Sequence, residues 1–347
     1  MAASNDNDHS LISRFGEIKQ MRFLARRLGF YVVALFAALT INFFIPRFLP
    51  GNIVESMMAK YPSLKPSAQR ALEILFGIGH NGSLLHQYIT YLGQIFTGNL
   101  GLDLLQFPIP VIDIIKNALP WTLVLVGTAT VISWVLGTGL GIIAAWRRGG
   151  KLDQLLPALS FLQATPYFFL ALILVWLLAL RFHVLPAQQG FSNGLSIGFN
   201  WAFILSAARH SLLPALTIVL TSTAGWMLQM RNVMITTIGE DYVLAAQAKG
   251  LSPKRVVFTY AARNAILPSI SGFALALGFV VSGTLLMEIV FNYPGIGLTL
   301  YNSVTSNDFP LTQGIFLIIS LTVLAANILA DVLYVIVDPR SRTRAVA

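Results

Sequence analysis

Residues 117–146, NALPWTLVLVGTATVISWVLGTGLGIIAAW, contain no Asp, Glu, Lys or Arg over 30 consecutive positions. A helix needs roughly 17–25 predominantly apolar residues to cross the hydrocarbon core of a bilayer. A charged side chain at the centre of that core costs at least about 2.5 kcal/mol. This stretch therefore predicts a transmembrane helix, and with it an integral membrane protein.

Five further runs are also free of charge and are 19 to 27 residues long: 28–46, 154–180, 211–230, 264–287 and 309–330. Only 11% of the 347 residues are charged, against about 25% in a soluble domain. We therefore predict an all-α polytopic membrane protein with six transmembrane helices. Two other charge-free stretches, 74–102 and 182–208, are interrupted every few residues by Gly, Asn, Gln, His or Ser. They are predicted to be interfacial or re-entrant helices with loops.

The distribution of cations predicts the orientation of these spans. With six spans and a cytoplasmic amino terminus, 16 of the 23 Lys and Arg residues face the cytoplasm, as the positive-inside rule requires. An additional span at 182–208 would move the basic segment 231–263 outside. Both termini are therefore predicted to be cytoplasmic.

Small residues recur in the run 117–146, at Gly127, Gly137, Gly139 and Gly141. Small side chains allow helix backbones to approach closely in a lipid environment. We interpret these glycines as a helix-packing surface rather than as part of a pore.

Several function classes find no support in the sequence. The net charge of +9 comes from short clusters between apolar runs rather than from one basic face, so no nucleic-acid partner is expected. The chain has no cysteine, and its histidines show no metal-ligand spacing: His9, His80, His86, His183 and His210. The tripeptide Gly149-Gly150-Lys151 lacks both the upstream Gly and the following Ser or Thr of a phosphate-binding loop. We expect no cofactor, no metal and no catalysis on this chain.

The most informative polar stretch is 239–268, GEDYVLAAQAKGLSPKRVVFTYAARNAILP. Carboxylates open a predicted short helix, Gly250 is placed as the residue that ends it, and Ser252 with Pro253 begins a second helix. Alanines on the first helix give it a low profile. Two interpretations remain open, a helix that docks into a groove on a partner and a solvated connector.

This segment resembles the cytoplasmic coupling loop of bacterial ABC importer permeases, in the variant of the dipeptide, oligopeptide and nickel permease family. The matching residues are Glu240-Asp241-Tyr242, Ala246, Ala248-Lys249-Gly250-Leu251 and Arg263-Asn264-Ala265-Ile266-Leu267-Pro268. The more general form of the loop has Glu where this chain has Leu244. The resemblance continues along nearly the whole chain, through Arg26-Arg27, Pro50-Gly51-Asn52, residues 92–102, Glu288, Pro294-Gly295-Ile296-Gly297, Asp308-Phe309-Pro310 and Asp338-Pro339-Arg340. Asn52 and Asn99 stand where the family usually has Asp.

The resemblance implies a type I importer fold and a set of partners. These are a homologous second permease, two ATP-binding subunits that hold ATP and Mg, an extracytoplasmic solute-binding protein and the lipid bilayer of the bacterial cytoplasmic (inner) membrane. It also implies that the loop contacts the ATPase through these residues: Glu240, Asp241, Tyr242, Ala245, Ala246, Ala248, Lys249, Gly250 and Leu251.

The expected organisation follows from the runs and the resemblance together. The segments are a cytoplasmic tail (1–20), a first transmembrane helix (21–46), an extracytoplasmic segment (47–116), a permease core with five transmembrane helices (117–340) and a cytoplasmic tail (341–347). The coupling loop occupies 231–263 within the core.

The substrate class and the role of two carboxylates remain open. The family moves peptides, nickel and in some members oligosaccharides of cello or manno type, and we favour peptides. A secondary transporter and a membrane-embedded enzyme are alternatives, but the chain shows neither an internal repeat nor a polar catalytic cluster. Glu288 and Asp331 lie near span ends, where an intramembrane carboxylate is a functional candidate. An interfacial anchor or an interhelical hydrogen bond is an equal alternative for both. Asn327, Asp331 and Tyr334 share one helix face and are interpreted as a hydrogen-bonding stripe.

Overall fold

The computed structural model describes residues 29–45, 47–48, 53–60, 66–75, 83–280 and 285–337. Predictions for the tails 1–20 and 341–347, for Pro50-Gly51-Asn52, for Asp338-Pro339-Arg340, and for His9 and His80 lie outside these residues. The described residues contain helices and loops and, apart from an isolated bridge between Leu102 and Pro110, no β-structure. The predicted all-α class is confirmed for this part of the chain.

All six charge-free runs contain helices. They correspond to the helix Gly29–Ile45, α5 (Val111–Trp146), α7 (Leu156–Ala164) with α8 (Tyr167–Leu174) and the π-helix η1 (Val175–Arg181), α9 (Trp201–Ile238), α13 (Leu267–Phe279) and α16 (Phe309–Val337). The shorter elements are α2 (Ile53–Lys60), α3 (Pro66–Leu75), α4 (Leu84–Phe96), α6 (Lys151–Gln154), α10 (Asp241–Ala248), α11 (Pro253–Arg255), the π-helix η2 (Val256–Ala261), α12 (Ala262–Ala265), α14 (Leu285–Val290) and α15 (Ile296–Thr305).

Fewer than six of these helices are long and apolar enough to cross a bilayer alone. Within the described residues, α5, α9 and Phe309–Leu329 of α16 meet that condition, and a bent pair formed by α7 and the helix that follows it makes a fourth candidate. Gly29–Ile45 and α13 are apolar but shorter. Three to four candidate spans are therefore present, and the six-span count stays a prediction.

The run 154–180 does not form one continuous helix. Its two helices, Leu156–Ala164 and Tyr167–Arg181, are bent by 99° relative to each other. The break lies at Thr165, whose backbone is extended (ψ 125°), and at the following Pro166. Proline lacks an N–H donor and disfavours the helical conformation in the residue before it, which accounts for the break.

The two polar charge-free stretches fold differently from each other. Residues 84–96 form α4, and a loop follows it, in agreement with the prediction of a helix with loops. Residues 182–200 are irregular, but from Trp201 onward the second stretch is the start of α9, which runs for 38 residues. The side chain of Asn200 caps this helix by accepting a hydrogen bond from the N–H of Phe203 at 2.8 Å, and the polar capping residue hid the continuity of the helix.

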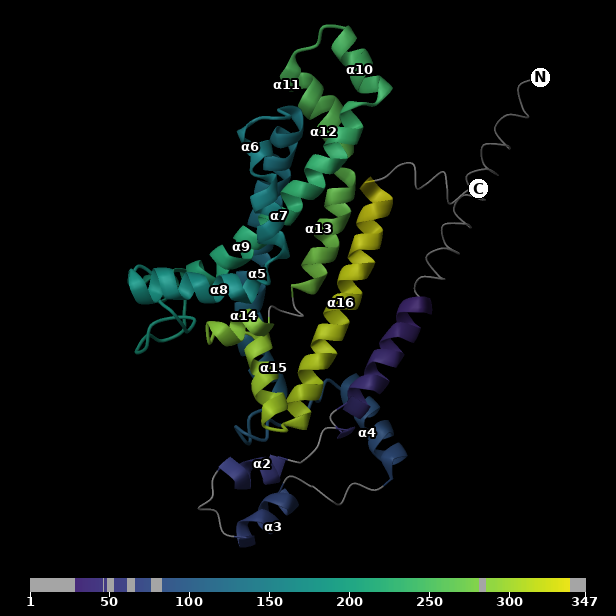
Figure 1. The fold of residues 1–347 in the computed structure, drawn as a ribbon. Coiled ribbons are helices and arrows are strands. Elements are labelled where there is room, and N and C mark those ends of the chain that lie inside the picture. The colour runs from purple at the N-terminus through teal and green to yellow at the C-terminus, as the bar shows by residue number, and fades with distance from the viewer. Residues whose placement is uncertain are drawn as a thin grey trace, which may run out of the picture.

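The helices α5 and α9 form the central pair of the molecule, and α13 lies beside α16 (Figure 1). The segments α10 and α11 lie at one end, and the turn between α15 and α16 lies at the opposite end (Figure 1). At that second end, Asp308 Oδ2 accepts hydrogen bonds from the N–H groups of Leu104 and Leu105 at 2.7 and 3.2 Å. Its other oxygen accepts one from the N–H of Leu311 at 3.1 Å, so one buried carboxylate joins the 104–105 loop to the start of α16.

Two of the four glycines in α5 allow its close contact with α9. A Cβ atom at Gly137 would lie 2.5 Å from Cβ of Trp226, and one at Gly141 would lie 2.7 Å from the carbonyl oxygen of Met227. Gly127 and Gly139 have nothing within 4 Å of such an atom. The packing interpretation is therefore confirmed for Gly137 and Gly141, which are four residues apart and share one helix face.

The substitution Gly141→Leu should separate α5 from α9 and lower the stability of the isolated chain. Overpacking a close contact costs typically about 1–3 kcal/mol. The matched substitution Gly139→Leu places the same side chain where nothing lies within 4 Å. Thermal unfolding in detergent, followed by size-exclusion chromatography, should show a lower Tm for Gly141→Leu only. Equal Tm values for the two variants would contradict the close contact.

Candidate coupling site and substrate groove

The helix α10 ends in a glycine-dependent turn. Gly250 has φ +71°, a left-handed conformation that favours glycine. Its N–H donates to the carbonyl of Gln247 at 2.9 Å, and the N–H of Leu251 donates to the carbonyl of Ala246 at 3.4 Å. These two bonds form a Schellman motif, with Lys249 as the C-cap residue. The predicted position of Gly250 is confirmed.

The residues after this turn differ in detail from the prediction. Ser252 has the backbone of an N-cap residue, and Pro253 opens α11, but the Ser252 side chain makes no capping hydrogen bond. The α-helix is only three residues long and continues through η2 and α12 toward α13. The general order of helix, glycine turn and second helical segment is as predicted.

One side of α10 packs against the chain itself. Val243 and Ala246 are buried in an apolar cluster with residues of α5, α9, η2 and α12, among them Met230 and Val256. Ala246 is 3% exposed, so its methyl group faces this internal cluster. Ala246 therefore fixes α10 to the chain, and its surface is closed to a partner.

The other predicted coupling residues remain accessible. The residues with exposed side chains or backbone are Glu240, Asp241, Tyr242, Ala245, Ala248, Lys249 and Gly250, and Leu251 is half-buried. Leu244, which departs from the general form of the loop, is 47% exposed. The outer side of α10 thus combines small, apolar and charged groups at one end of the molecule (Figure 1).

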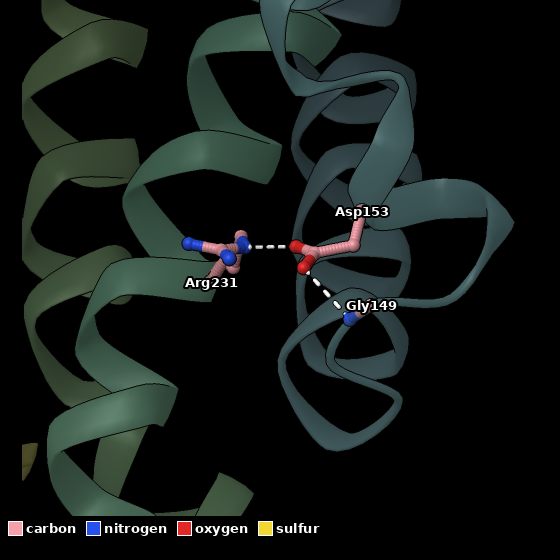
Figure 2. Close-up of polar contacts among 3 residues, drawn as sticks. All are labelled: Gly149, Asp153 and Arg231. Atoms are coloured by element: carbon pink, nitrogen blue, oxygen red, sulfur yellow. Dashed lines mark hydrogen bonds and ion pairs between the residues drawn. The ribbon is translucent and has the colours of Figure 1, made fainter.

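A charged contact ties α6, the short helix between α5 and α7, to α9. Arg231 Nε donates to Asp153 Oδ1 at 2.6 Å, and the N–H of Gly149 donates to Asp153 Oδ2 at 2.9 Å, as Figure 2 shows. The Arg231 guanidinium and then the Gly149 N–H hold the pKa of the Asp153 carboxyl below its usual value. A lowered pKa means that the contact stabilises the folded chain above the usual carboxyl pKa and is lost as the pH falls through the lowered value. The contact is therefore intact at neutral pH.

A groove of about 830 Å³ lies between α5, α7, α9 and α13. Its lining contains no charged residue, and most of its members carry a hydroxyl or amide group: Ser160, Gln163, Thr221, Ser222, Gln229 and Asn232. Its volume is within the roughly 300–1,000 Å³ range of small-molecule sites. Its lining residues come from four helices, α5, α7, α9 and α13.

Reasoning from charge missed these groove residues. Ser, Thr and Gln do not interrupt a charge-free run, so the runs 154–180 and 211–230 gave no sign of a hollow. A signal was present in the spacing, because Thr221, Gly225, Gln229 and Asn232 recur at intervals of three or four residues and therefore share one face of α9. A small or polar face within an apolar run indicates a packed or hydrated surface.

Glu288 serves an internal contact. The side chain is fully buried, and its Oε1 accepts a hydrogen bond from Thr122 Oγ1 at 2.6 Å. The N–H of Leu298 donates to Oε2 at 3.0 Å. A Cβ atom at Gly295 would collide with the carboxylate, which explains the glycine that follows Pro294. Of the two alternatives for this residue, the structure favours the hydrogen-bonding one.

Asp331 also makes an interhelical contact. Tyr31 Oη donates to Asp331 Oδ2 at 2.5 Å, which links the helix Gly29–Ile45 to α16. This contact agrees with the predicted hydrogen-bonding stripe, although the side chain of Tyr334 is outside the described set. Among the described residues, no group of three or more histidine or carboxylate side chains could hold a metal ion.

Comparison with known proteins places the chain in a family. Residues 137–343 match the family described as "Binding-protein-dependent transport system inner membrane component". The chain is similar to the di/tripeptide transport system permease protein DppB of Pseudomonas aeruginosa, with 32% identity over 93% of this chain and 99% of the relative. It is 29% identical to the oligopeptide transport system permease protein AppB of Bacillus subtilis over 92% of this chain and 98% of that relative.

A third relative is the dipeptide transport system permease protein DppB of Escherichia coli, with 28% identity over 93% of this chain and 99% of that protein. The family match covers the end of α5 and the elements from α6 to α16, and the relatives extend the similarity to almost the full chain. The chain belongs to the family of inner membrane components of binding-protein-dependent transport systems, and is an integral membrane transport subunit of the ABC importer type.

Proposed function

We propose that the chain is one of two homologous permeases of an ATP-driven importer that moves short peptides across the bacterial cytoplasmic membrane. The observation that carries the proposal is the order of α9 and α10, because α9 bears a face of the uncharged groove and is followed, after a turn at Gly239 and Glu240, by the exposed helix α10. The three relatives described above are named as di/tripeptide, oligopeptide and dipeptide permeases.

The proposed partners are supported by the family membership and by the exposed side of α10. ATP and Mg would be bound by two partner ATPases, one of which docks on the outer side of α10, and a solute-binding protein would deliver the peptide on the opposite side. A second, homologous permease would complete the path. The chain itself supplies no cofactor and no ATPase site.

The residues that line the groove favour some candidate substrates over others. Nickel requires nitrogen, sulfur or carboxylate ligands, and the groove lining contains no His, Met, Asp or Glu. Oligosaccharides also suit hydroxyl and amide groups and remain the second candidate. A secondary transporter needs neither a binding protein nor a coupling helix, so the family membership weighs against it.

The six-span topology with both termini cytoplasmic is part of the proposal and can be tested with single cysteines, since the chain has none of its own. Cysteines at Gly149 and Ser252 should react with a membrane-impermeant thiol reagent only from the cytoplasmic side. Cysteines at Ser192 and Asn307 should react only from outside. Cytoplasmic labelling at Ser192 would overturn this orientation.

Docking on α10 predicts different results for two adjacent alanines. Ala245→Arg adds a bulky charge to the exposed side, so the isolated chain should keep its Tm while co-purification of the ATPase falls. Ala246→Arg forces a charge into the internal cluster and should lower the Tm of the isolated chain, since an unpaired buried charge is strongly destabilising. The exposed loop substitution Gln188→Arg should change neither quantity. Parental recovery of the ATPase by Ala245→Arg would refute docking at this surface.

Peptide import should require the complete assembly. Proteoliposomes that contain both permeases, both ATPases and the binding protein should accumulate a labelled tripeptide when ATP is supplied on the ATPase side. Vesicles with this chain alone should neither hydrolyse ATP nor accumulate the peptide. Accumulation of cello- or manno-oligosaccharides but not of peptides would replace the proposed substrate, and transport by this chain unaided would refute the assembly.

A further inference from the structure

The groove presents amide side chains that have no partner among the residues that the structure describes. Gln163 on α7 and Gln229 and Asn232 on α9 are exposed, and their amide groups form no hydrogen bond with any described residue. Gln163 lies beside Gly225, where an added Cβ atom would be 3.4 Å from Gln163 Nε2, and Gln229 lies beside Gly272. Small residues thus leave room for the amides on both sides of the groove.

Two of these amides lie in runs that are predicted to span the membrane, where a polar group without a partner is unfavourable. Gln163 and Gln229 lie inside charge-free runs, and burying an amide in an apolar medium without a hydrogen bond costs about 1–3 kcal/mol on the scale of protein mutations. Contact with lipid would leave both amides unsatisfied. Their surroundings must therefore supply donors and acceptors, from water or from a solute in the groove.

A tightly packed second permease fits the groove poorly. Helices in membranes associate through close packing of small residues, and the contact of α5 with α9 at Gly137 and Gly141 shows that arrangement. The groove is instead hollow and about 830 Å³ in volume. Its stripe from Thr221 to Asn232 spans about 16 Å at 1.5 Å per residue, which matches an extended chain of about five residues.

The chemistry of the lining matches a peptide backbone. Each Gln or Asn amide both donates and accepts hydrogen bonds, as each peptide unit does. The lining carries no charge of either sign, whereas rings of charged side chains make a pathway selective for ions of the opposite sign. A path lined in this way would bind the peptide backbone. It would not distinguish peptides by the charge of their side chains.

We propose that this groove is part of the substrate path on the coupling-helix side, and that Gln163, Gln229 and Asn232 bind the backbone of a peptide in transit irrespective of the charge of its side chains. The inference rests on the proposed function. It adds the residues of the path and the reason for tolerance of cationic, anionic and neutral peptides. The three amides act as positioning and specificity-determining residues.

The test uses the complete assembly in proteoliposomes with Ala-Lys-Ala, Ala-Glu-Ala and Ala-Ala-Ala, each at a concentration that saturates the binding protein. The parental ratio of Lys-peptide to Glu-peptide import sets the reference. Gln163→Glu and Gln229→Glu should each raise that ratio by roughly 25-fold, because a charge about 4 Å away in water favours the Lys peptide roughly five-fold and disfavours the Glu peptide by the same factor. Gln188→Glu, the same change in the loop 182–200, should leave the ratio unchanged.

A second measurement does not depend on transport. In the assembled complex, cysteines at Gln163 and Gln229 should react with anionic and cationic water-soluble thiol reagents of similar size. A cysteine at Val135, on the exposed apolar surface of α5, should not react. Unreactive cysteines at Gln163 and Gln229 would show a groove sealed by lipid or by the second permease, and would overturn the inference.

The two proposals fail separately. Import of Ala-Ala-Ala by the parental assembly with an unchanged charge ratio in both Glu variants would refute the groove assignment and leave the importer intact. If the parental assembly imports no peptide, the proposed substrate fails, and the binding of peptide by the amides fails with it. The cysteine reactivities would then still decide whether the groove is a water-filled path.

Discussion

The contact between α5 and α9 is the constraint on which the rest of the structure depends. Gly137 and Gly141 bring the backbones so close that a Cβ atom at either position would collide with α9. The same two helices contribute to the apolar cluster that contains Val243 and Ala246 of α10. They also contribute to a second cluster, which contains Leu125 and Leu213. Because lipid provides little hydrophobic drive for helix association, this shape complementarity is what fixes the framework.

Within this framework α9 lies next to two surfaces of the molecule. Its polar face lines the groove, and a turn at Gly239 and Glu240 connects its end to the exposed helix α10. The contact of Arg231 with Asp153 holds the start of the α6–α7 segment to α9 at the level between these two regions (Figure 2). The contact thus joins the segment that precedes α7 to α9, and α7 and α9 are the two helices that carry the amides of the groove.

The sequence predicted where the helices lie better than it predicted where they bend or which of their residues are buried. Charge-free runs located all six apolar segments because the cost of a charge in lipid is large, and glycine chemistry located the end of α10 at Gly250. Pro166 can be seen in the sequence inside the run 154–180, but a proline by itself gives no bend angle. The direction of Ala246 depends on tertiary packing of α10, which no local pattern encodes. The groove was missed because uncharged polar residues are tolerated in an apolar run.

On α9, a paired charged residue and a residue that lines the groove occupy adjacent positions. Arg231 is adjacent in sequence to Asn232, yet it is taken up by Asp153, whereas Asn232 lines the groove. An unpaired Arg beside the groove would attract anionic solutes and repel cationic ones, since charges about 4 Å apart interact by about 1 kcal/mol even in water. Pairing this cation with Asp153 offsets its charge beside the groove, so the proposed path keeps an uncharged lining up to Asn232.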